Sequence, residues 1–123
     1  MQMQPSYQYA ATILRWVDGD TVHVQCQLGF RVSQELIVRL IGIDTPERGR
    51  AGYDTAKQRA ATLAPAGTQV VLRTYKPDPA DKWNRWLGRI FYDDSRDVST
   101  TLLAEGLARP YDGGTKEQGS LSQ

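Results

Sequence analysis

The stretch Tyr7–Cys26, YQYAATILRWVDGDTVHVQC, decides the fold. Its first part, Tyr7–Val17, is rich in aromatic and β-branched residues and predicts a strand. Asp18-Gly19 is typical of a hairpin turn, because glycine accepts a positive φ at little cost. Apolar and polar residues then alternate, which predicts a second strand with Asp20 on the same face as its valines. A carboxylate on the inner face of a sheet needs a partner or a metal ion.

The rest of the chain predicts three more strands and two helices. The expected strands cover residues 35–43, 69–75 and 85–92, and the expected helices cover 54–63 and 98–105. A turn is expected over residues 28–33, around Gly29. We interpret this order as mainly β with helices (α+β): a five-stranded antiparallel barrel of the OB type with two packed helices. A plain α+β sheet is the alternative.

Composition limits the class of protein. The 123 residues predict one domain, 7–111, with flexible termini at 1–6 and 112–123, the latter a polar tail. A net charge of +1 gives no general preference for polyanions, and one cysteine excludes an internal disulfide. No apolar run is long enough to span a membrane. The start of the chain does not resemble a secretory signal, so we expect a cytoplasmic protein if Met1 is the native start, and a secreted or periplasmic one if a signal was removed.

Acidic residues at strand ends suggest a cation site. Asp20 opens the second strand, and Asp44-Thr45-Pro46-Glu47 closes the third. Oxygen ligands of this kind suit a hard cation such as calcium. Each cluster also has a plain structural interpretation: a hairpin turn for the first, and for the second a helix start with Thr45 as cap and Pro46 at the first position.

Two arginines stand out by their surroundings. Arg39 lies within the apolar segment Ile37–Ile43, where a guanidinium is costly unless it is paired or faces an anion. Arg85 ends the cluster Asp81-Lys82-Trp83-Asn84-Arg85, which could clamp a phosphate and contact a sugar or base. A structural ion pair is the alternative for Arg39, and a solvated loop is the alternative for the cluster.

Taken together, two acidic clusters and two isolated arginines predict a metal–phosphate site. The acids would hold a cation, and the arginines would neutralise a phosphodiester. Other chemistries lack the residues that they need. His23 is the only histidine and alternates with the apolar residues of a strand, so a serine or cysteine triad has no base. No glycine-rich phosphate loop is present for nucleotide binding.

The chain resembles the staphylococcal nuclease (thermonuclease) family over about residues 8–111. Four segments account for the resemblance: Val17–Val22, Arg39–Glu47, Asp81–Arg85 and Leu102–Arg109. The resemblance implies an OB barrel with packed helices, a monomer, and calcium-dependent hydrolysis of DNA and RNA with little sequence selectivity. It also implies cleavage of the bond to the 5′ oxygen, leaving a 3′ phosphate, and a preference for single-stranded or frayed segments.

The resemblance also assigns roles to residues. Asp20 and Asp44 look like calcium ligands, with Thr45 offering its backbone carbonyl. Glu47 looks like the residue that orients or deprotonates the attacking water. Arg39 and Arg85 look like the phosphate clamps. The residues that look like substrate contacts are Lys82, Trp83 and Tyr111. Trp83 and Asn84 stand where tyrosine and glycine are common, although asparagine still tolerates a positive φ.

A second class of function stays open. OB barrels also bind single strands without cleaving them, by stacking and basic grooves. We therefore keep a non-catalytic nucleic-acid-binding module as the alternative to a nuclease. Binding that persists with a chelator and yields no product would favour it.

Overall fold

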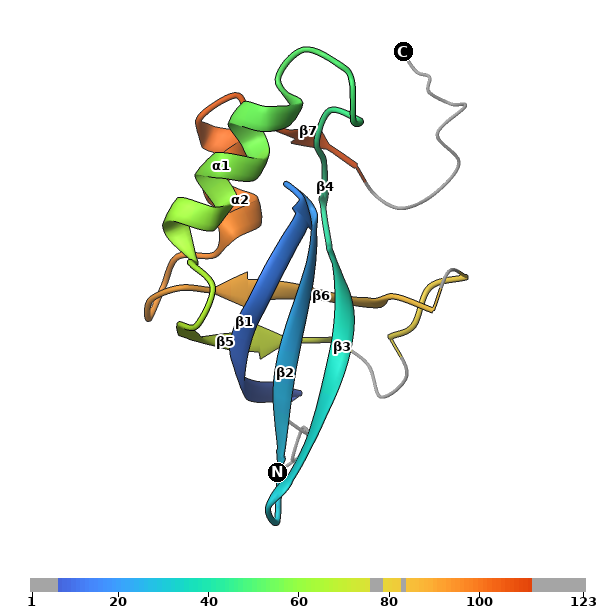
Figure 1. Ribbon diagram of the computed structural model, residues 1–123, viewed down its shortest axis with the longest axis vertical. Coiled ribbons are helices and arrows are strands. Elements are labelled where there is room, and N and C mark those ends of the chain that lie inside the picture. The colour runs from blue at the N-terminus through green and yellow to red at the C-terminus, as the bar shows by residue number, and fades with distance from the viewer. Residues whose placement is uncertain (1–6, 76–78, 83, 112–123) are drawn as a thin grey trace, which may run out of the picture.

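The computed structural model describes residues 7–75, 79–82 and 84–111. Its centre is a closed barrel with the strand order β1-β2-β3-β6-β5, in which β5 also pairs with β1 (Figure 1). The two helices pack together at one end of the barrel, and the short strands β4 and β7 lie at the same end (Figure 1). The elements are β1 Gln8–Asp18, β2 Thr21–Gly29, β3 Val32–Leu40, β4 Ile43–Asp44, α1 Tyr53–Leu63, β5 Gln69–Arg73, β6 Trp86–Phe91, α2 Val98–Ala104 and β7 Arg109–Pro110.

The predicted barrel is confirmed, but the expectation that it is antiparallel throughout was wrong. Strand β3 pairs in parallel with β6, with Val38 opposite Trp86, while the other pairs in the barrel are antiparallel. The reason is geometric. Strand directions cannot alternate perfectly around a closed ring with an odd number of strands, so at least one pair must be parallel.

The first hairpin forms as predicted, with Asp18 paired to Thr21, but Gly19 is needed for a different reason. Its φ is not among the positive values in the chain. A Cβ at this position would instead lie 3.0 Å from both Ala56 Cβ and Thr45 Cγ2. Glycine therefore lets the turn pack closely against helix α1 and the chain beyond β4.

The expected strand 35–43 differs at both ends. Strand β3 starts earlier, at Val32, after a tip formed by Phe30 and Arg31, whose φ angles are 56° and 65°. It ends at Leu40, because Gly42 takes a φ of +88° and turns the chain. The two residues that follow form β4, which pairs with β7 rather than with the barrel.

Both predicted helices are confirmed to within one residue at each end. Helix α1 begins at Tyr53 after Gly52, so the interpretation of Thr45 as a helix cap was wrong. Trp16 ties this helix to the barrel, since its Nε1 donates to the carbonyl of Ala64 at 2.8 Å. The core fills the barrel and the space under the helices, and its largest fully buried members are Ile13, Leu40, Ile43, Leu72, Ile90 and Leu102.

In the described ranges, no helix has the length and apolar character needed to cross a membrane. The predicted flexible termini, 1–6 and 112–123, lie outside the described residues.

Candidate active site

Asp20 and Asp44 are brought together at the helix-bearing end of the barrel. The turn between β1 and β2 presents Asp20, and β4 presents Asp44. The Asp20 carboxylate accepts hydrogen bonds from the backbone N–H of Thr45 (3.1 Å) and from the Thr21 hydroxyl (3.1 Å). These bonds fix the buried carboxylate and tie the turn to the chain that follows β4. The predicted inward orientation of Asp20 is therefore confirmed.

Arg39 lies between the two carboxylates. Its Nη2 is 3.5 Å from Asp20 Oδ2 and 3.4 Å from Asp44 Oδ1. Its Nη1 donates to the backbone carbonyls of Leu40 (2.9 Å) and Ile43 (3.0 Å). The Arg39 side chain is only 11% exposed, and it needs such partners because an unpaired buried charge is strongly unfavourable. The predicted structural pairing of Arg39 is thus present, and it involves the same acids that were predicted to hold a cation.

The donor set fits a hard divalent cation. Asp20 and Asp44 converge on one atom of Arg39, and both supply carboxylate oxygens, the ligand type that calcium prefers. The hydroxyl of Thr45 is buried next to them and has no hydrogen-bond partner in the described part of the chain. That part of the chain holds no cluster of three or more His, Cys, Asp or Glu side chains suited to a metal ion. Two carboxylates would therefore have to be supplemented by backbone carbonyl oxygens, water or substrate.

Arg85 is held by its own loop. The two oxygens of Asp81 accept from the backbone N–H of Arg85 (2.8 Å) and from its Nε (2.9 Å), and Nη2 lies 2.9 Å from Oδ2. Asn84 adopts a φ of 62°, as expected for a residue in a glycine-like position. The loop therefore presents Arg85 in a fixed place immediately before β6.

One cleft, with a volume of about 810 Å³, joins these groups. Tyr111 closes one side: its backbone N–H donates to Gly42 (3.0 Å) and the Arg39 guanidinium lies 5.5 Å from the centre of its ring. The predicted residues that line the cleft are Asp20, Arg39, Asp44, Thr45, Glu47, Lys82, Arg85 and Tyr111. Trp83, the remaining predicted substrate contact, lies outside the described residues.

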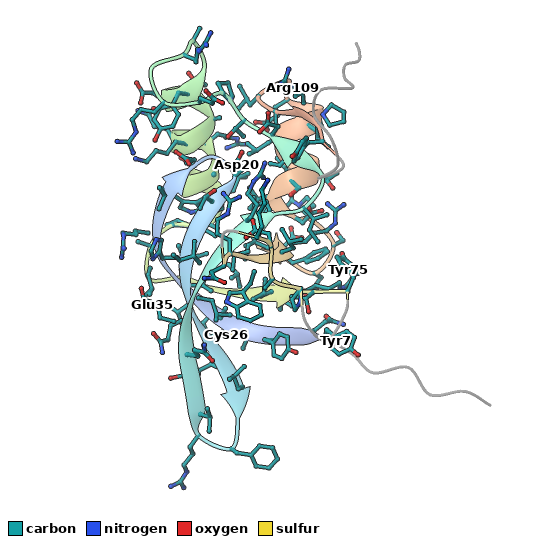
Figure 2. All side chains as sticks on the ribbon, turned by 90° about the vertical axis from the view of Figure 1, so that its right-hand side faces the viewer. Tyr7, Asp20, Cys26, Glu35, Tyr75 and Arg109 are labelled. Carbon is teal, nitrogen blue, oxygen red and sulfur yellow. The ribbon has the colours of Figure 1, made fainter. Side chains whose placement is uncertain are left out.

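Arg109 is a neighbour of the site to which sequence reasoning assigned no role. Its Nη2 lies 3.2 Å from Asp44 Oδ2, because β7 pairs with β4 in a register that sets these two residues opposite each other. Figure 2 shows Asp20 and Arg109 toward the same end of the molecule, with Cys26 and Glu35 farther down the barrel. Arg48 also lines the cleft and was not predicted. No local pattern in the sequence predicts that Arg109 contacts Asp44 or that Arg48 lines the cleft.

Comparison with known proteins places this arrangement in a family. The family model described as "Staphylococcal nuclease homologue" matches residues 37–123. Endonuclease YncB of Bacillus subtilis (strain 168) is 34% identical over 104 residues, which cover 80% of this chain and 46% of that protein. The thermonuclease of Staphylococcus intermedius is 31% identical over 107 residues, with 79% and 56% coverage. The micrococcal nuclease of Shigella flexneri is 31% identical over 111 residues, with 84% and 59% coverage.

The chain thus spans about half the length of these curated relatives. The family match covers well over half of this chain and includes Arg39, Asp44, Glu47 and Arg85. The barrel fold agrees with the same assignment. The chain belongs to the staphylococcal nuclease family.

Proposed function

We propose that this chain is a calcium-dependent nuclease that hydrolyses phosphodiester bonds of DNA and RNA with little sequence selectivity. The single observation that supports this most strongly is the shared cleft. It brings the charged residues of the predicted site together from four separate segments of the chain, namely Asp20, Arg39, Asp44, Glu47 and Arg85. Structural ion pairs account for Arg39 with its acids and for Arg85 with Asp81, but they do not account for the exposed Glu47 on the wall of the same cleft.

In this proposal the carboxylates of Asp20 and Asp44 and the backbone carbonyl of Thr45 hold calcium. A cation bound there supplies positive charge to a phosphodiester that enters the cleft. Arg39 and Arg85 then bind the nonbridging phosphate oxygens through forked hydrogen bonds. Charge that develops on these oxygens during in-line attack is stabilised by the same groups.

Glu47 is the candidate general base. It lies on the cleft wall beyond β4, is exposed, and accepts no side-chain hydrogen bond within the described residues. A carboxylate in this position can orient a water molecule and take its proton as the oxygen attacks phosphorus. We propose that the bond from phosphorus to the 5′ oxygen breaks, which leaves a 3′ phosphate.

Substrate contacts would come from the edges of the cleft. Lys82 would meet a neighbouring phosphate, and Tyr111 would stack on a base or sugar. Trp83 lies outside the described residues, and its proposed stacking role rests on the family resemblance alone. Stacking on the face of a base requires that the base is unpaired. We therefore propose that single-stranded or frayed segments are preferred.

Cleavage of single-stranded DNA tests the proposal. Wild-type protein and Glu47→Ser are compared with calcium and with excess chelator, and Glu35→Ser serves as a matched control because Glu35 is exposed on β3, away from the cleft (Figure 2). We expect calcium-dependent cleavage by wild type and the control, and a loss of about 100-fold or more in Glu47→Ser. Folded wild type that binds DNA in chelator and never cleaves it would instead identify a non-catalytic binding module.

A further inference from the structure

A second basic surface adjoins the cleft. The loop between β4 and α1 presents Arg48 and Arg50, and the first turns of α1 present Lys57. Together with Tyr53 they line a shallow hollow of their own. Arg48 belongs to both places, because it also lines the cleft. We call Arg48, Arg50 and Lys57 the basic loop surface.

These cations differ from most others in the described part of the chain. The arginines that form ion pairs with carboxylates are Arg39, Arg59, Arg85, Arg89, Arg96 and Arg109. None of the three cations of the basic loop surface forms an ion pair with a described residue, although Asp54 lies on the same hollow. Charge that is not neutralised within the protein is available to an anionic partner.

The basic loop surface is held in place next to the cleft by contacts of Tyr53. Tyr53 is buried, and its hydroxyl donates to the carbonyl of Val17 (2.9 Å), just before the turn that presents Asp20. The Arg48 guanidinium and the Lys57 ammonium each lie 5.9 Å from the centre of the Tyr53 ring. The loop itself is closed by a hydrogen bond from the backbone N–H of Arg50 to Glu47 (2.9 Å).

We infer that the basic loop surface binds backbone phosphates of the nucleic-acid strand beyond the scissile bond. This rests on the proposed function, because the cleft must hold the scissile phosphate for a strand to continue over the loop. Arg48 lines both the cleft and the hollow, so a strand that leaves the cleft would pass Arg48 first and then Arg50 and Lys57. Such contacts carry no sequence information, which agrees with a nuclease of low selectivity.

The test measures binding without cleavage. Fluorescein-labelled dT12 and dT3 are titrated with wild type and with Arg50→Gln/Lys57→Gln in excess chelator over a series of salt concentrations. Log K falls as log[salt] rises, and for dT12 we expect this negative slope to become shallower by about 0.7 for each phosphate contact that is lost. For the shorter dT3, which offers fewer phosphates beyond the one in the cleft, we expect a smaller change in slope than for dT12.

Charge-matched and fold-matched variants complete the design. Arg15→Gln/Arg31→Gln removes two exposed cations that have no described ion pair, and Arg31 lies at the β2–β3 tip, at the opposite end of the molecule from the loop (Figure 1). We expect this control to keep the wild-type slope. Arg50→Gln alone, which removes an exposed side chain without touching Tyr53, covers the case in which the double variant does not fold.

The outcomes separate this inference from the proposed nuclease activity. An equal slope for dT12 in the basic-loop variants and in wild type overturns the inference, whether or not the protein cleaves DNA. If the slope becomes equally shallow in the Arg15→Gln/Arg31→Gln control, the inference is also overturned. A specific loss of slope in a protein that never cleaves supports the surface and contradicts only the nuclease.

Discussion

The guanidinium of Arg39 lies 3.5 Å from the carboxylate of Asp20, and both side chains are about nine-tenths buried. A proposed phosphate clamp thus shares a carboxylate with a proposed metal site. Two consequences follow from Coulomb's law. The acids compensate the buried arginine, and the arginine in turn opposes any second cation that binds to the same acids.

Replacement of Arg39 by glutamine should therefore separate two properties. We expect cleavage to fall about 100-fold, because one phosphate-binding charge is lost. We expect calcium binding to tighten, because a positive charge next to Asp20 and Asp44 is removed. Calcium titrations followed by thermal unfolding and by cleavage rate measure both, with Arg15→Gln as the control. Unchanged calcium affinity together with near wild-type cleavage would contradict the arrangement.

Calcium should stabilise the folded chain through the two carboxylates. At a concentration 100 times its Kd, a ligand that binds only the folded state adds about 2.7 kcal/mol to the free energy of unfolding. Asp44→Asn removes one of the two side-chain ligands, so most of this gain should disappear. Urea unfolding with calcium and with chelator measures it, with Asp54→Asn as the control on helix α1. A full calcium effect in Asp44→Asn would exclude Asp44 as a ligand.

Asp97 should matter for stability and not for cleavage. Its buried carboxylate caps helix α2 by accepting from the backbone N–H of Thr100 (3.1 Å), and it pairs with Arg89 (3.1 Å). Asp97→Ala leaves both groups without this partner, so we expect a loss of about 1–3 kcal/mol in urea unfolding. Asp93→Ala, at an exposed pair in the same segment, should change the unfolding midpoint much less.

Charged residues inside apolar strands were what the sequence could reveal about the site. Asp20 and Arg39 interrupt apolar patterns, and a buried charge is costly enough that such an interruption predicts a partner nearby. The structure confirms this, with each as a partner of the other. The closed barrel was also accessible, because alternation and turn residues mark its strands locally.

Features that depend on pairing between distant segments could not be predicted from the sequence. Arg109 contacts Asp44 only because β4 and β7 pair across 65 positions of sequence, and each of these strands has two residues. Gly42 ends β3 within an apolar run that reads as one continuous strand. The direction of β6 relative to β3 follows from closure of the ring and not from any local pattern.

The forked ion pair between Arg59 and Glu105 should make stability depend on pH. Nε and Nη2 of Arg59 donate to the two carboxylate oxygens of Glu105, both at 2.8 Å, and so join α1 to the end of α2. The hydrogen bond from Arg59 lowers the pKa of Glu105 below its ordinary value of 4.5. Because the folded-state pKa is the lower one, the pair stabilises the protein above about pH 4.5, and this contribution is lost as the pH falls through the folded-state value.

Glu105→Gln should consequently lower the melting temperature at pH 6.5 and have a smaller effect at pH 3. The hydrogen bond that Asp93 accepts from the backbone N–H of Ser95 lowers the pKa of Asp93 as well. Asp93 is present in both wild type and Glu105→Gln, so its contribution cancels in the difference between their melting temperatures. The pair is more than a third exposed, so the effect should be small and should shrink in high salt. Arg59→Gln should give the same pH dependence, and the double variant should lose little more than either single one. An equal loss at both pH values would mean that Glu105 acts through packing and not through its charge.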